Sequence, residues 1–348
     1  MGLKNNRKTR ARLHRQLARL YPSLRINIIL RVLEIERSTI LGFRADAQLA
    51  MVLAACTGLE KLELPDTVTE NYGPLSRKVI RWAARSSPKD GEVRMLGKLK
   101  HLELADMCGG IDVSDVIDML SLPNIKDLRL WGLVDQSTRN PRRLPSPEDM
   151  PMVTNQNLVD LTLRHCRHLT DEGLTRILAA CPRIRTLFLH APMSSRNEHQ
   201  PISFTSALTK YGKNLEFLWL ETQRKTGLAK VPGESRRLLR ALNSMRDLRT
   251  LVLWRGDFGS AEALGSALPS SLRELLIIGH NDEIETDEDG EVVGSSQDRI
   301  SLFGLVDHPS LVNLERVEVV DINAWEGRPY WRKAIEYCIE ARQLPPSC

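Results

Sequence analysis

The sequence predicts an α/β solenoid, in which short parallel strands form one side and mostly helices form the other. An apolar triplet of the pattern LxxLxL recurs ten times between residues 30 and 320, with starts 24 to 42 residues apart. Helix-compatible segments lie between the triplets, and two of them end in the same four residues, Leu-Ala-Ala-Cys at 53–56 and 178–181. A single strand–helix unit cannot bury its own apolar edge, so we expect the copies to stack around one core.

The chain begins with a basic segment, residues 1–29, that we expect to cap the first unit. Its leucines at 13, 17, 20 and 24 have helical spacing, and residues 1–33 hold nine Lys or Arg and no acid. A terminal unit needs such cover because one of its sides has no neighbour. The same pattern is typical of a nuclear-import signal in residues 4–12 or of a mitochondrial-type presequence, and both alternatives stay open.

The solenoid itself is predicted over residues 30–320. Each triplet combines a strand of period two with one apolar residue before it, and the ten triplets start at 30, 59, 99, 125, 158, 184, 215, 248, 272 and 314. Asp112, Asp171 and Ser260 are the predicted N-caps. The expected helices are 46–56, 75–85, 112–120, 171–181, 203–211, 234–245 and 260–268. Residues 321–348 are predicted to form a C-terminal capping helix, about 330–341, and a Pro-containing tail.

One segment, residues 158–189, carries a longer signature: LVDLTLRHCRHLTDEGLTRILAACPRIRTLFL. It resembles the cysteine-containing subtype of leucine-rich repeat, LxxLxLxxCxxLTDxGLxxLxxxCPxLxxLxL, through Cys166, Thr170, Asp171, Gly173 and Cys181. The full motif covers one repeat, and the looser LxxLxL pattern covers about residues 30–320. This subtype is typical of F-box/leucine-rich-repeat proteins, the substrate receptors of cullin-type ubiquitin ligases, and the irregular insertions most resemble the fungal members. The resemblance implies a horseshoe-shaped repeat array that recognises a protein.

The resemblance does not extend to the F-box. That helical module precedes the repeats and docks the ligase adaptor, whereas the 29 residues before the first triplet are Arg-rich and lack a Leu-Pro start. We therefore expect a protein-interaction module, with substrate recognition for an F-box-type ubiquitin ligase as the leading hypothesis. A cullin-ligase adaptor is an expected partner if an F-box is encoded upstream. The alternative is a free-standing scaffold or an enzyme regulator with no ubiquitin link.

Composition disfavours several other classes of protein. A net charge of +5 is too small to indicate a nucleic-acid partner, and no apolar run approaches the roughly 18 residues of a membrane span. Six cysteines in 348 residues do not suggest a disulfide scaffold. We expect Cys56, Cys166 and Cys181 to be reduced and packed, and the protein to be cytoplasmic or nuclear.

The predicted binding surface is the concave side of the strands. Side chains between the leucines point away from the core and form columns across neighbouring strands. Aromatic side chains beside Arg and His are typical of interface hot spots. The predicted partner-binding residues are Trp131, Phe188, Phe217, Trp219 and Trp254, flanked by Arg129, Arg164 and His190. The insertions 131–156, 190–202 and 221–233 leave the same side of the strands, so burial of these aromatics as core stays open.

Candidate chemistry is sparse, and we expect no enzyme activity, cofactor or metal. The acidic insertion 282–291 resembles a calcium loop at Glu285, Asp287, Asp289 and Gly290, but Ser296 stands where a bidentate Glu completes such a site. A solvated acidic loop is therefore expected. The segment 165–168 has no second Cys/His pair at zinc-site spacing. Nucleophile and phosphate-binding motifs are absent from the sequence.

Overall fold

A computed structural model describes much of the repeat region of the chain. The described residues are 49–50, 52–54, 56–64, 74–85, 95–105, 110–135, 154–166, 169–190, 204–221, 240–254, 261–279, 285–286, 292–293, 305 and 308–321. The predicted N-terminal cap and the first triplet lie outside them. So does the predicted C-terminal cap, apart from its first residue.

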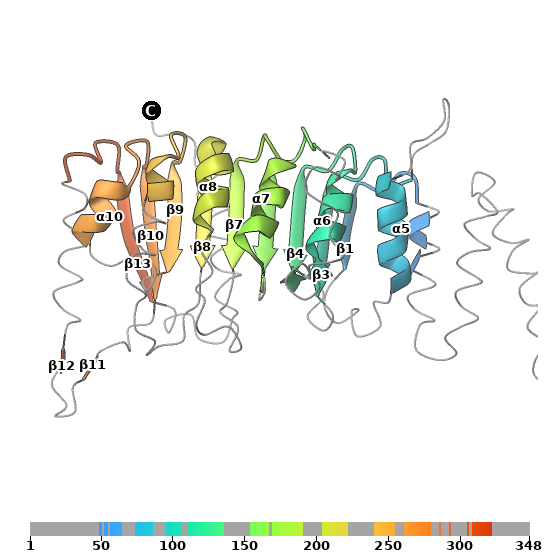
Figure 1. The fold of residues 1–348 in the computed structure, drawn as a ribbon, viewed down its shortest axis with the longest axis horizontal. Coiled ribbons are helices and arrows are strands. Elements are labelled where there is room, and N and C mark those ends of the chain that lie inside the picture. Colours follow the sequence, from blue (N-terminus) through green and yellow to red (C-terminus); the bar gives the residue numbers. More distant parts are fainter. Residues whose placement is uncertain are drawn as a thin grey trace, which may run out of the picture. The chain divides into compact units, whose positions relative to one another are not determined.

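Nine of the described strands form one sheet, in the order β1-β2-β4-β6-β7-β8-β9-β10-β13 (Figure 1). Each coincides with one of the nine triplets predicted from residue 59 onward, so the α/β fold class expected for leucine-rich repeats is confirmed. The strands are β1 (Lys61–Leu64), β2 (His101–Ala105), β4 (Asp127–Trp131), β6 (Asp160–Arg164), β7 (Thr186–His190), β8 (Phe217–Glu221), β9 (Thr250–Trp254), β10 (Glu274–Gly279) and β13 (Arg316–Asp321).

The chain divides into two compact units, residues 1–188 and 189–348, and each is described by itself. In the first unit the strands pair in parallel with the leucines in register: Leu62 with Leu102, and Leu102 with Leu128. In the second unit Leu218 pairs with Leu251 in the same way. These leucines are buried, because alternate side chains of each strand face the helices.

Helices pack on one side of the strands in each unit (Figure 1). The first unit has α5 (Pro74–Arg85), α6 (Val113–Leu120) and α7 (Asp171–Ala179), and the second has α8 (Thr205–Tyr211), the 3-10 turn η3 (Gly212–Asn214) and α10 (Ala261–Ala267). Residues 52–54 and 240–243 are also helical. No described helix is long and apolar enough to cross a membrane.

Two short ladders were not predicted. A parallel pair joins β3 (Ile111–Asp112) to β5 (Leu133–Val134), and an antiparallel pair joins β11 (Glu285–Thr286) to β12 (Val292–Val293). The second ladder lies at the acidic insertion, which we expected to be an unstructured loop. Strands of two residues cannot be predicted from the sequence pattern, because an alternation of apolar and polar residues is recognisable only over about four residues or more.

The LTDEG segment forms a compact junction at the start of α7. Thr170, and not the predicted Asp171, is the N-cap: its hydroxyl accepts from the Gly173 N–H at 2.9 Å and also bonds the buried carboxylate of Asp135. A Cβ on Gly173 would lie 2.6 Å from an oxygen of Asp135. Any larger residue at this position would therefore displace the Asp135 carboxylate from its bond to Thr170. The predicted cap Asp112 is confirmed, since its side chain accepts from the Ser114 N–H at 2.8 Å, and Ser260 lies outside the described residues.

Polar side chains tie successive turns of the first unit together. Asn155 is buried, and its amide donates to the carbonyls of Leu120 and Leu122 at 2.9 and 3.2 Å while its oxygen accepts from the Leu158 N–H. Cys166 and Cys181 are buried free thiols, as expected, and burial raises the pKa of each. Cys56 is also free and is half-buried.

Candidate functional site

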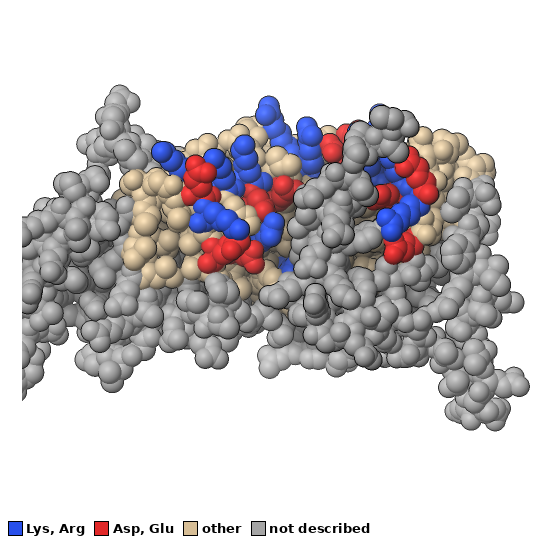
Figure 2. Space-filling view, turned by 180° about the vertical axis from the view of Figure 1, so that it is seen from behind, with Lys and Arg blue, Asp and Glu red and all other residues tan. Residues whose placement is uncertain are grey.

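The candidate site is the sheet face that points away from the helices. In the first unit, strand register brings Glu63, Glu103, Arg129 and Thr162 into one column of neighbouring residues. A second column, two residues earlier in each strand, holds Lys61, His101, Asp127 and Asp160. Side chains two apart in a strand share a face, so both columns lie on the surface seen in Figure 2, where charged side chains gather.

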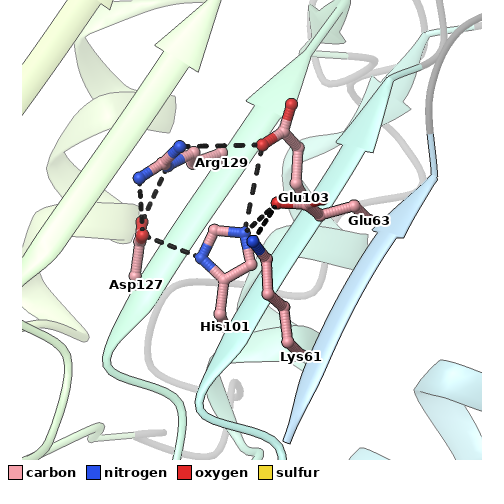
Figure 3. A network of polar contacts seen from close by, with 6 residues as sticks. All are labelled: Lys61, Glu63, His101, Glu103, Asp127 and Arg129. Carbon is pink, nitrogen blue, oxygen red and sulfur yellow. Dashed lines mark hydrogen bonds and ion pairs between the residues drawn. The ribbon is translucent and has the colours of Figure 1, made fainter. Parts of the chain in front are cut away.

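Six of these side chains form the polar network of Figure 3: Lys61, Glu63, His101, Glu103, Asp127 and Arg129. The His101 ring lies at its centre, with Nδ1 2.8 Å from an Asp127 oxygen and Nε2 3.4 Å from a Glu63 oxygen. Arg129 donates to Asp127 at 2.9 Å, and Lys61 lies 2.7 Å from Glu63. The cations Lys61 and Arg129 thus face three carboxylates, and the His101 ring lies within 3.9 Å of an oxygen of each carboxylate.

The network lowers the pKa of two of its carboxylates, Asp127 and Glu63. Burial by itself would raise the pKa of Asp127, but the hydrogen bond from His101 and the charge of Arg129 outweigh burial and leave the pKa below its ordinary value. The hydrogen bond from Lys61 lowers the pKa of Glu63. Glu63 is nevertheless exposed at the surface, with 46% of its side chain accessible. The network is thus both ordered and open to a partner.

Three members of the network have metal-ligand chemistry. Among the described residues, Glu63, His101 and Glu103 place one ligand atom each within 4.8 Å of the others. The ammonium of Lys61 already lies on Glu63, and the guanidinium of Arg129 lies 3.8 Å from Glu103. A bound cation would have to compete with both, so the cluster is accounted for by its own ion pairs.

Next to the network, Arg164 lies between two aromatic rings. Its guanidinium carbon is 4.7 Å from the centre of the Trp131 ring and 4.6 Å from that of Phe188, which is cation–π geometry on both faces. Arg164 is 2% exposed and Phe188 is 5% exposed, whereas Trp131 is half-buried. The sequence placed these three residues on one face correctly, but the structure packs them against one another.

In the second unit the part of this face formed by β8, β9 and β10 has a buried apolar centre. Trp219, Val252 and Leu276 are neighbours in register, and all are at most 4% exposed. Phe217 is also buried, and the buried His190 lies 3.8 Å from Glu221. These predicted hot spots therefore do not form an exposed patch in this structure, which matches the alternative of burial as core. Their role in partner binding stays a prediction, and the side chain of Trp254 is not described.

The sequence interpretation missed half of the polar network. Lys61, His101 and Asp127 stand just before the second apolar residue of their triplets, and only the two later columns were considered. The period of two that placed Glu63 and Glu103 outward applies equally two residues earlier. Arg129 is the one predicted binding residue that the network contains.

Comparisons with known proteins bear on the fold only loosely. No protein-family model matches the chain, and no curated protein sequence does. Among solved structures, the leucine-rich-repeat-containing protein LegL7 of Legionella pneumophila is similar at 15% identity and a TM-score of 0.37, with 78% of each chain covered. The Rad7 and Elc1 complex in yeast is similar at 21% identity and a TM-score of 0.42, covering 90% of this chain and 69% of that one. With both scores below 0.5, the fold assignment rests on the strands and helices of the chain itself.

Proposed function

We propose that the chain is a protein-recognition module that binds a partner on the partly exposed polar face of β1, β2 and β4. The observation that carries the proposal is the polar network, in which six charged or titratable side chains are fixed in register on a parallel sheet. Ion pairs between neighbouring side chains hold these groups in place before a partner arrives. Binding to a prearranged surface costs less side-chain entropy than binding to a flexible one.

The kind of partner follows from the charge pattern. Glu63 and Glu103 lie side by side, and both are accessible, while Lys61 and Arg129 flank them. A partner that presents a basic side chain towards the two glutamates and an acid towards Arg129 would match this surface. Such complementarity sets specificity and association rate more than affinity.

The more specific proposal is that the partner is a substrate protein of an F-box-type ubiquitin ligase. It is supported by the cysteine-type repeat signature at 158–189, which resembles that of F-box/leucine-rich-repeat receptors. The test is affinity purification of the full-length gene product with quantification of cullin-ligase subunits. Enrichment of an adaptor and a cullin supports the proposal. A partner set without any ligase subunit refutes the ubiquitin link and favours a free-standing scaffold or regulator.

The recognition surface has its own test. Glu63→Lys together with Glu103→Lys should abolish binding of the most enriched partner, because both accessible acids change sign. Glu172→Lys is the control for a reversed acid away from this face, since Glu172 is exposed on α7, on the helical side of the sheet. Equal binding by the double variant and the control would show that this face is not the interface.

A further inference from the structure

A half-open groove of about 470 Å³ lies in the second unit, at the edge where β8, β9 and β10 begin. Three arginines line it: Arg246, Arg249 and Arg273. We call it the arginine groove. It lies at the starting edge of the strands, where Figure 2 shows Lys and Arg side chains together with Asp and Glu side chains. None of its described lining residues belongs to the polar network.

The backbone fixes two of these arginines on neighbouring strands. The Arg249 N–H donates to the carbonyl of Glu216 at 2.8 Å, and the Arg273 N–H donates to the carbonyl of Arg249 at 2.8 Å. The parallel hydrogen-bond pattern between β8, β9 and β10 therefore extends to Arg249 and Arg273, each of which directly precedes its strand. Equivalent residues of adjacent strands lie about 4.8 Å apart, so the two long side chains start close enough together to reach acidic groups of one ligand.

The neutral polar residues of the groove tie its turns together. The Ser271 hydroxyl donates to the carbonyl of Leu248 at 2.8 Å, and the Asn313 amide donates to the carbonyl of Ser270 at 2.7 Å. These bonds link each turn to the one before it. The backbone that carries the arginines is thus held in place by hydrogen bonds, so less conformational entropy is lost when a ligand binds.

The arginine charges are available to a ligand. All three side chains are exposed, and among the residues that the structure describes neither Arg246 nor Arg249 has an ion-pair partner. Arg273 lies 3.7 Å from Glu315, with 48% and 57% of the two side chains exposed. An exposed ion pair of this kind contributes little to stability, so Arg273 can leave Glu315 and bind an acidic group of a ligand instead.

We propose that the arginine groove binds an extended acidic segment of a partner protein, with its carboxylates on Arg249 and Arg273. Guanidinium groups bind planar or tetrahedral anions such as carboxylates and phosphates through two parallel hydrogen bonds, so paired arginines suit an acidic ligand. Two lining residues, Glu216 and Asp247, are themselves acidic. They favour a peptide with spaced acids over the continuous phosphates of a nucleic acid. Among the described residues that line the groove, none is aromatic, so none offers a ring on which a base could stack.

The test is a fluorescence-anisotropy titration of the full chain with a fluorescein-labelled peptide in which glutamate alternates with serine. The same peptide with lysine in place of glutamate is the probe control. The glutamate peptide should bind, more weakly as salt rises to about 0.15 M, and the lysine peptide should not. Arg249→Glu with Arg273→Glu should weaken binding at least about tenfold.

Lys126→Glu with Arg183→Glu is the matched control variant, because it reverses the same number of exposed charges in the first unit. It should leave peptide binding within about twofold, since neither residue lines the groove. Arg249→Gln with Arg273→Gln should also weaken binding, which guards against a folding defect caused by the reversed charges. Circular dichroism of each variant confirms that it is folded.

Three results would overturn the proposal: no binding of the glutamate peptide by the wild-type chain, equal loss in the control variant, or displacement by single-stranded oligothymidylate at lower concentrations than by unlabelled peptide. The polar network is intact in the groove variants. A loss of peptide binding in the groove variants therefore tests the arginine groove alone, and the Glu63 and Glu103 experiment tests the polar network alone. Either proposal can fail while the other holds.

Discussion

Replacing Trp219 with alanine separates the two interpretations of the aromatic sheet face. The side chain is 1% exposed and its register neighbour Val252 is fully buried. A buried tryptophan removes about 200 Å² of surface from water, which at about 25 cal/mol per Å² corresponds to about 5 kcal/mol. Alanine retains part of this burial, so we expect Trp219→Ala to lower the free energy of unfolding by about 3–5 kcal/mol.

The chain offers a matched control in Trp82, which lies on α5 and is 42% exposed. Trp82→Ala removes the same atoms from a partly solvated site, where alanine is also the better helix former, and should cost about 1 kcal/mol or less. Urea unfolding followed by far-ultraviolet circular dichroism measures both variants. This signal is preferable to fluorescence because each variant loses a tryptophan.

A cost for Trp219→Ala no larger than that for Trp82→Ala would refute the assignment of Trp219 to the core. If such a variant also lost its partner, the original prediction of an aromatic binding face would be restored. If instead Trp219→Ala unfolds readily, any loss of binding by it reports on stability. The partner-binding prediction for Phe188, Phe217 and His190 must then be tested with smaller changes.

Three further predictions concern the polar groups. Asn155→Ala should lower the free energy of unfolding by about 2–4 kcal/mol, because buried backbone groups lose their hydrogen-bond partner. Asn157 is exposed and has one side-chain bond to a backbone carbonyl, so Asn157→Ala should lower the free energy of unfolding by less than about 1 kcal/mol. Equal urea midpoints for the two variants would contradict this prediction. Thr170→Ala should lower stability by about 1–2 kcal/mol, and Thr170→Ser should recover most of it in thermal melts. The pKa of Asp127 lies below its ordinary 3.8 in the folded protein. The ionised Asp127 therefore stabilises the fold above pH 3.8, and this contribution is lost as the pH falls through the lower pKa of the folded protein. Asp127→Asn should therefore make the free energy of unfolding fall less steeply at acid pH. An unchanged dependence on pH would show that Asp127 does not have a lowered pKa.

Local patterns predicted the framework of this protein well. Nine triplets became nine paired strands because each pattern needs only alternation within a few residues to mark a buried side. Asp112 was found as a cap because capping depends on residues within one helical turn. The cap of α7 was misplaced by one residue, because Thr170 and Asp171 are both favourable N-cap residues and only the structure shows which of them accepts from the Gly173 N–H.

The sequence by itself determined which residues share a face of the sheet, because side-chain direction in a strand has a fixed period of two. It therefore placed Glu63, Glu103 and Arg129 in one column and Phe188 and Trp219 on the same side of their strands. Only the tertiary structure decided that the first three are accessible and the last two are buried. Exposure depends on what segments distant in sequence pack over a face, and periodicity carries no information about that.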